Sequence, residues 1–195
     1  LLVEKELHFK DNPQYVIADS LNEFTTANVV NLEWTIKKVI TNQEGKVTES
    51  VNLVSLNNNQ SIKAIRKIGN DFLVKIYENE ENALYLLQGN NLKFLYKTSA
   101  LLELKGVGAN FFVIKDASDF KLIEITDDNM SISSLNQNVL NANDDFLVSP
   151  EMVVAINDKI QFSKIKEKDL LSFLKNNAGK SIVQLIKIEE STRPR

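Results

Sequence analysis

Short apolar runs, separated by clusters of turn-forming residues, recur along almost the whole chain of 195 residues. The runs are rich in Val, Ile, Leu, Phe and Tyr, while Asn, Asp, Gly and Ser fill the intervals between them. This alternation is typical of β-strands, because β-branched and aromatic side chains pack well on a pleated surface. The chain therefore predicts an all-β fold with mainly antiparallel strands. Since there are only 6 glycines, we expect Asn and Asp to occupy many of the turns.

Three segments of the chain share one pattern, in which a polar turn leads through a phenylalanine into an apolar strand. The phenylalanines are Phe72, Phe111 and Phe146. One apolar run precedes each of them and two more follow, so the repeating unit has four short strands over about 40 residues. The preceding runs are 62–68, 101–104 and 139–140. A poorer fourth copy begins near 12–18 and uses a hairpin predicted from two extended arms, 29–40 and 47–55.

This period and strand count resemble the degenerate blade repeats of β-propellers of the WD40-like kind. The resemblance implies a propeller-like or partial propeller fold, since a single blade cannot cover both of its own faces. The chain departs from the WD40 pattern because it has no Gly-His and Trp-Asp pairs, and Trp34 lies outside the three better copies. The alternative is a β-sandwich or a meander with evenly spaced hairpins. Neither architecture specifies a function.

One segment near the C-terminus follows a helical period instead. Within 167–177, Leu170, Leu171 and Leu174 form one apolar stripe with Phe173 beside it. Acidic residues at the start and a lysine at the end agree with the helix dipole. We therefore predict one C-terminal helix.

The remaining segments complete the predicted organisation of the chain. Residues 182–188 return to a strand pattern, and 20–26 have a weaker helical pattern. The predicted division has three parts: 1–60 with N-terminal strands and the long hairpin (a first blade), 61–165 with the repeated four-stranded units, and 166–195 with the helix, a strand and a polar tail.

Composition excludes several kinds of chemistry. The chain has no cysteine, which removes disulfides, zinc–thiolate sites and thiol catalysis, and its single histidine, His8, cannot form a two-histidine metal motif. The 23 basic and 26 acidic residues give a net charge of −3, which argues against direct electrostatic binding of nucleic acid. No stretch of about 18 apolar residues is present, so we expect no membrane span and a soluble protein, with an intracellular location favoured.

Acidic residues gather in four predicted loops without the spacing of a calcium-binding loop. They are Glu78, Glu80 and Glu81; Asp116 and Asp119; Asp127 and Asp128; and Asp144 and Asp145. We interpret them as solvated turn residues, and the sequence predicts no metal, no cofactor and no catalytic residue.

The missing catalytic motifs and the repeated strand units together predict a non-catalytic subunit that binds other protein subunits or acts as a scaffold in a larger assembly, not an enzyme. The residues proposed for such contacts are Trp34, Tyr96, Leu170, Leu171, Phe173 and Leu174. One alternative is a ligand-binding or hydrolytic propeller-like domain that uses the loop carboxylates. Another is a structural component of a surface, phage or secretion machine. The lack of cysteine and the start at Leu1 rather than Met, which indicates a shortened or processed chain, suggest this last alternative.

Overall fold

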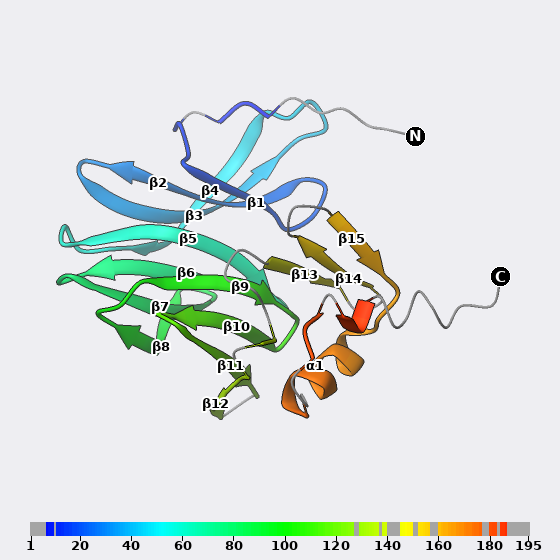
Figure 1. Cartoon of the computed structure of the whole chain (residues 1–195). Helices are drawn as coiled ribbons and strands as arrows, with labels where there is room; N and C mark the ends of the chain where they lie inside the picture. Colours follow the sequence, from blue (N-terminus) through cyan, green and yellow to red (C-terminus); the bar gives the residue numbers. More distant parts are fainter. Residues whose placement is uncertain are drawn as a thin grey trace. The chain divides into compact units, whose positions relative to one another are not determined.

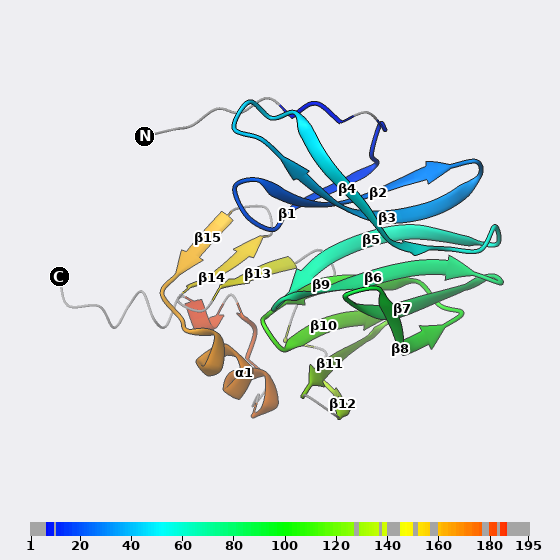
Figure 2. The ribbon, with the colours of Figure 1, turned by 180° about the vertical axis from the view of Figure 1, so that it is seen from behind.

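The computed structural model describes most of the chain as short strands (Figures 1 and 2). The described residues are 7–9, 11–126, 129–136, 138–139, 145–149, 152–156, 160–176, 180–182 and 184–186. They form four sheets, and within each sheet strands that follow one another in sequence are neighbours. The all-β, mainly antiparallel fold with one C-terminal helix is therefore confirmed.

The first sheet contains β1 (Tyr15–Ala18), β2 (Glu23–Val30), β3 (Glu33–Thr41) and β4 (Val47–Ser55). The second contains β5 (Gln60–Ile68), β6 (Asp71–Glu78), β7 (Glu81–Gln88) and β8 (Asn91–Thr98). The third contains β9 (Leu102–Val107), β10 (Phe111–Asp116), β11 (Asp119–Ile125) and β12 (Met130–Ser134). The fourth contains β13 (Asp145–Ser149), β14 (Met152–Ile156) and β15 (Ile160–Ser163), and the helix α1 spans Glu167–Lys175.

The chain divides into two compact units. Unit 1 comprises Leu1–Lys67 and Asp71–Ser99, and unit 2 comprises Ile68–Asn70 and Ala100–Arg195. The first two sheets belong to unit 1, apart from Ile68 at the end of β5, and the other two sheets with α1 belong to unit 2. The three-part division expected from the sequence, with boundaries after residues 60 and 165, stays a prediction.

An apolar core joins the two sheets of unit 1. Ala27 of β2 and Ile36 of β3 are buried in this core, where they meet Val74 and Ile76 of β6. Successive residues of a strand point to opposite faces of the sheet. The residues beside Ala27 and Ile36 therefore belong to the outer face of the first sheet, away from this core.

Unit 2 has a core of its own, in which the helix takes part. Phe111, Phe146, Leu170 and Leu174 are all buried in it. Helix α1 lies against β14, and β13 lies beside β9 (Figures 1 and 2). The helix thus covers one face of the fourth sheet with the apolar stripe that the sequence predicts.

Two polar contacts fasten α1 to the third sheet. The side chain of Glu167, in the first turn, accepts a hydrogen bond from the backbone N–H of Ala109 at 2.6 Å. Lys175, in the last turn, forms an ion pair with Glu124 of β11, with a distance of 2.6 Å between Nζ and Oε1. Both ends of the helix are therefore held within unit 2.

The repeat expected from the sequence agrees with the strands in two of its copies. Phe72, Phe111 and Phe146 are all buried at or near the start of a strand, and the first two copies have four strands each. The third copy differs, because Val139 lies in a bend and its sheet has three strands among the residues that the structure describes. Val139 is instead buried in the core of unit 2, and its carbonyl accepts a hydrogen bond from the N–H of Ile182 at 3.0 Å.

Three local predictions were wrong. The extended arm 29–40 is interrupted by a hairpin turn at Asn31 and Leu32, whose φ angles are 51° and 70°. Asn tolerates this left-handed conformation, which is why a turn can form without glycine. The segment 20–26 enters strand β2 instead of a helix, in keeping with its β-branched Thr25 and Thr26.

The third correction concerns the strand predicted at 182–188. Its described residues are helical, and the N–H of Leu185 donates to the carbonyl of Ser181 at 3.1 Å, which is the spacing of an α-helical turn. The side chains of Ile182 and Ile186 are buried in the core of unit 2, four residues apart on one helical face. The spacing of these two buried residues therefore agrees with the observed helical turn, whereas the content of β-branched residues had led to the wrong prediction of a strand.

No described helix combines the length and apolar character needed to cross a membrane; α1 has 9 residues.

Substitution of Gly106 tests the contact between β9 and β13. A Cβ atom at this position would lie 2.1 Å from Cε2 of Phe146, a ring that the core prevents from moving. We therefore expect Gly106→Ala to lower the free energy of unfolding by about 1–3 kcal/mol, as overpacking does in other cores. Urea denaturation of the full chain measures this change.

The double variant Gly106→Ala/Phe146→Leu is the control for this contact. It should recover part of the stability that the first substitution removes, because the smaller side chain makes room for the added methyl group. An unchanged unfolding midpoint in Gly106→Ala would show that the ring of Phe146 does not rest on this glycine.

Candidate functional site

The candidate site lies on the outer face of the first sheet of unit 1. This face is crossed by an extended segment that we call the strap, residues 7–9 and 11–14. The N–H of His8 donates to the carbonyl of Gly45 at 3.2 Å, and the N–H of Gln14 donates to the carbonyl of Ala27 at 2.9 Å. The strap is thus attached at one end to the β3–β4 turn and at the other to β2.

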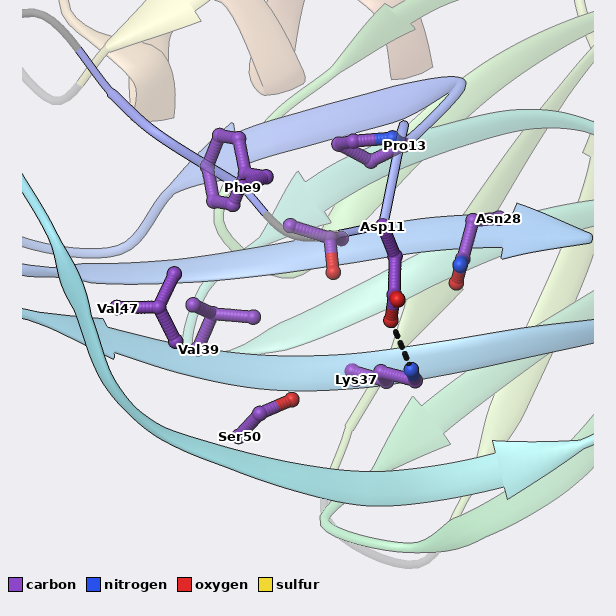
Figure 3. Close-up of a pocket in the computed structure, with 9 residues that line it drawn as sticks. Phe9, Asp11, Pro13, Asn28, Lys37, Val39, Val47 and Ser50 are labelled. Atoms are coloured by element: carbon purple, nitrogen blue, oxygen red, sulfur yellow. Dashed lines mark hydrogen bonds and ion pairs between the residues drawn. The ribbon is translucent and has the colours of Figure 1, made fainter. Parts of the chain in front are cut away.

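A cavity of about 220 Å³ lies between the strap and the sheet (Figure 3). Phe9, Asp11 and Pro13 contribute from the strap, and the other lining residues come from β2, β3 and β4. These sheet residues are Thr26, Asn28, Lys37, Val39, Val47 and Ser50. Because Thr26 and Asn28 flank Ala27, they point away from the core of unit 1 and toward the strap.

The cavity has an apolar part. Phe9, Pro13, Val39 and Val47 supply carbon surface from both the strap and the sheet. The ring of Phe9 also meets the ring of Phe24 edge to face, with 6.1 Å between the centroids. This aromatic contact holds the first part of the strap on the sheet.

The charged groups of the cavity neutralise each other. Nζ of Lys37 donates to Oδ2 of Asp11 across the cavity, and the Lys37 side chain is 19% exposed (Figure 3). No other lining residue in the described part of the chain carries a charge. The described lining therefore has no net charge.

Asn28 is the unusual residue of this cavity. It is 4% exposed, and its Oδ1 atom accepts no hydrogen bond from any described residue. An unsatisfied buried acceptor costs about 1–3 kcal/mol, so such groups are generally satisfied by water or by a ligand. The cavity wall thus includes a residue with a buried acceptor that has no donor among the described residues.

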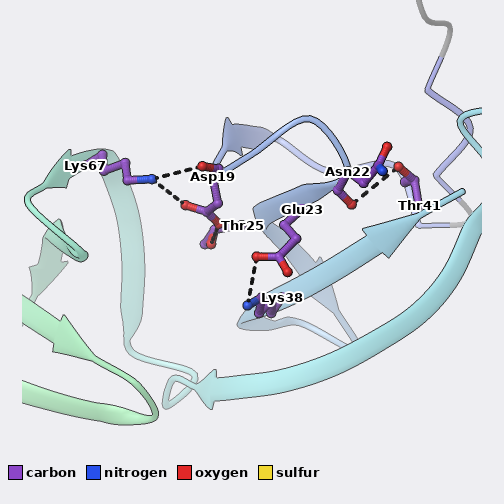
Figure 4. A network of polar contacts seen from close by, with 7 residues as sticks. All are labelled: Asp19, Asn22, Glu23, Thr25, Lys38, Thr41 and Lys67. Carbon is purple, nitrogen blue, oxygen red and sulfur yellow. Dashed lines mark hydrogen bonds and ion pairs between the residues drawn. The ribbon is translucent and has the colours of Figure 1, made fainter. Parts of the chain in front are cut away.

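A polar network holds the strands that carry the cavity (Figure 4). Asp19, in the β1–β2 turn, accepts a hydrogen bond from Thr25 at 2.8 Å and forms an ion pair with Lys67 of β5 at 3.2 Å. Glu23 of β2 pairs with Lys38 of β3 at 3.1 Å. These contacts connect the first sheet to the second and keep β2 and β3 aligned beneath the strap.

The structure places the six residues proposed for protein contacts at other points. Leu170 and Leu174 are 0% and 2% exposed, and Leu171 and Phe173 pack against the same core of unit 2. Trp34 packs against the core of unit 1 beside Tyr15, with 6.0 Å between the ring centroids. The stripe on α1 is therefore used inside its own unit.

Tyr96 is half-buried on β8, the last strand of the second sheet. Neither Tyr96 nor Trp34 lines the cavity. The cavity residues could not be predicted from the sequence, because each of them occupies an ordinary position in a strand or loop.

The loop carboxylates do not form a metal site in the part of the chain that the structure describes. No group of three or more His, Cys, Asp or Glu side chains comes together there. Asp116 pairs with Lys121 at 2.6 Å, and Asp145 pairs with Lys105 at 3.2 Å. Asp127, Asp128 and Asp144 lie outside the described residues.

Glu78 is a buried structural carboxylate. Its Oε1 accepts a hydrogen bond from the hydroxyl of Tyr85 at 2.7 Å, and its Oε2 accepts one from the amide of Gln60 at 2.5 Å. Burial by itself raises the pKa of Glu78, but these two hydrogen bonds and the charge of Lys97 together bring the pKa below its ordinary value. Burial and the hydrogen bond to Glu78 raise the pKa of Tyr85 to about 12.

No model of a known protein family matches the chain, and no curated protein matches it. Among the solved structures that match is a crystal structure from Bacteroides uniformis, provisionally named a 6-phosphogluconolactonase. It is 12% identical in sequence, with a TM-score of 0.48, and the match covers 85% of this chain. The chain spans 56% of the length of that protein.

The prediction of a non-catalytic interaction or scaffold subunit is corrected here. The helical stripe on which the prediction relied is buried in the core of its own unit, so it is not free to bind another subunit. We retain neither this function nor the related one of a structural component in a surface, phage or secretion machine. That the chain is not an enzyme stays a prediction.

Truncation of Leu170 tests whether the stripe on α1 belongs to the core. We expect Leu170→Ala to lower the free energy of unfolding by about 2–5 kcal/mol, since it leaves a cavity at a fully buried position. Lys168→Ala, on the exposed side of the same helix, should change it by less than about 0.5 kcal/mol. Urea denaturation of both variants measures the difference, and equal stabilities would contradict this placement.

The network around Glu78 predicts a dependence of stability on pH. Because its pKa is lower in the folded chain, Glu78 stabilises the fold above its ordinary pKa of 4.5, and this contribution is lost as the pH falls through the folded value. Tyr85→Phe removes one hydrogen bond to the carboxylate. We expect it to cost about 1–3 kcal/mol at pH 7 and to make the loss of stability in acid less steep.

The control for this prediction is Tyr77→Phe, because Tyr77 is exposed on β6 and makes no hydrogen bond with Glu78. Chemical denaturation at pH 7 and at pH 3 compares the two variants with the parent chain. If Tyr85→Phe and Tyr77→Phe give the same acid profile, Glu78 does not contribute in this way.

Proposed function

We propose that this chain is a small-molecule-binding protein and that its ligand occupies the cavity beneath the strap. The observation that carries the proposal is Oδ1 of Asn28, a buried acceptor without a donor among the described residues, in the wall of a cavity. A folded chain retains such a group at a cost in stability. Binding of a donor at this atom removes that cost.

The size and lining of the cavity support this proposal. Sites for drug-sized ligands measure about 300–1,000 Å³ and combine apolar walls with a few placed polar groups. This cavity has the same mixed lining at about 220 Å³. It therefore suits a molecule smaller than a drug, of the size of a simple metabolite.

We also propose that the sheets are blades of a propeller-like architecture. The support for this is the order of their strands, since each sheet is a meander of consecutive strands and three of the sheets have four. The aligned and buried Phe72, Phe111 and Phe146 are a second support.

A substitution at Ser50 tests the proposed ligand site. Ser50 lines the cavity from the exposed strand β4, so Ser50→Trp should fill the cavity without disturbing a core. We expect a library of small polar compounds, followed by NMR chemical-shift changes in the labelled chain, to yield ligands that perturb the strap and the cavity residues. Ser50→Trp should weaken their binding at least tenfold.

The matched control is Val51→Trp, since Val51 is the next residue of β4 and faces the other side of the sheet. It should bind the same compounds as the parent chain does. Equal binding by Ser50→Trp and the parent chain, or no compound that perturbs the cavity, would overturn the proposal.

A further inference from the structure

The chemistry of the cavity wall restricts the ligand beyond its size. Two features of the described residues bear on its charge: Asp11 and Lys37 pair with each other, and the other lining residues that the structure describes are uncharged. A charged ligand covered by the strap would lose part of its hydration without gaining an uncompensated partner of opposite charge among the described residues, which is costly. A neutral ligand avoids this cost.

The polar groups of the wall determine what the ligand must offer. Oδ1 of Asn28 needs a donor, whereas the hydroxyls of Thr26 and Ser50 can each donate as well as accept. A ligand hydroxyl both donates and accepts, so one type of group suits the whole polar wall. Several hydroxyls on one small molecule therefore match this cavity better than a single amine or carboxylate.

The apolar groups of the wall require a carbon surface on the same molecule. Phe9 and Pro13 of the strap and Val39 and Val47 of the sheet leave no hydrogen-bonding partner on their side of the cavity. A ring whose C–H faces are apolar and whose edges carry hydroxyls has both kinds of surface. The cavity volume is about 220 Å³, and each water molecule in the liquid occupies about 30 Å³, so the cavity corresponds to about seven water molecules. This is enough space for one ring that carries hydroxyl groups on its edge.

We infer that the ligand of this cavity is a neutral cyclic polyol of the size of a monosaccharide, with one hydroxyl donating to Oδ1 of Asn28. This inference rests on the proposed function. It assigns Asn28 as the residue that determines specificity, Phe9 and Pro13 as the surface that covers the ring, and the Asp11–Lys37 pair as the element that excludes charged analogues.

The test is a titration of the full chain with a panel of defined probes, followed by calorimetry and NMR. The neutral probes are glucose, galactose and myo-inositol. The charged probes are glucose 6-phosphate and glucosamine, and cyclohexanol supplies the ring without most of the hydroxyls. We expect at least one neutral polyol to perturb the strap and the cavity residues and to bind at least tenfold more tightly than its charged counterparts and cyclohexanol.

Variants of Asn28 and Ser50 identify the residues responsible. Asn28→Leu should weaken binding of that polyol at least tenfold, yet it should not lower the unfolding midpoint, because it replaces an unsatisfied amide by an apolar group. Ser50→Ala, on the exposed strand β4, provides a second variant that leaves the core intact and should weaken binding severalfold. Asn90→Leu, in the turn between β7 and β8, is the control and should bind as the parent chain does.

The outcomes separate this inference from the proposed function. If charged probes or cyclohexanol bind as tightly as the polyols, or if Asn28→Leu and Ser50→Ala both bind normally, the inference is wrong. If no polyol binds while other library compounds perturb the cavity, the inference is wrong and the proposed function stands. If no compound perturbs the cavity, both are wrong.

Discussion

Each sheet of this fold has apolar residues on at least one face, and these residues must be covered by another part of the chain. A four-stranded meander has two faces, and each of them must meet another layer or water. In unit 1 the core residues around Ala27 and Ile36 cover the inner face of the first sheet. In unit 2 the stripe of α1, with Leu170 and Leu174, performs the same task on the fourth sheet. The two units thus cover sheet faces with different elements, another sheet in the first and a helix in the second.

The outer face of the first sheet is covered only by the strap among the described residues, and the cavity lies where the strap leaves space above the sheet. The strap is a single extended segment, whereas a sheet or a helix would bring several rows of side chains to the same surface. Phe9 reaches Phe24 and thereby closes one end, but no described side chain reaches Oδ1 of Asn28. A face covered by one segment therefore retains both a free volume and a polar group within it.

The sequence predicted those parts of the fold that depend on local periodicity. Apolar runs between turn residues indicated the strands, the recurring Phe72 and Phe111 marked two complete meanders, and the spacing of Leu170 and Leu174 indicated α1. The errors arose where tertiary contacts decide the local conformation. Val139 is buried in a bend instead of a strand, and Ile182 joins the core from a helical turn.

The cavity could not be predicted from the sequence, and the reason is a different one. In β2, Asn28 follows Ala27 as any outward-facing polar residue would follow a buried one. This alternation does not show whether water or another segment of the chain covers the outer face of the sheet. The contact that decides this joins Asp11 to Lys37, which are 26 positions apart. Likewise the apolar stripe of α1 was visible, but a stripe of this kind looks the same whether a partner or its own sheet covers it.

The two attachments of the strap have a consequence for the order of folding. The bond from Gln14 to Ala27 continues the β1–β2 ladder, whereas the bond from His8 to Gly45 needs the β3–β4 turn to be present before it can form. Closing a longer loop costs more entropy than closing a hairpin, which places this step after the pairing of adjacent strands. The part of the strap around His8, although it precedes the sheet in the sequence, is therefore among the last parts of unit 1 to become ordered.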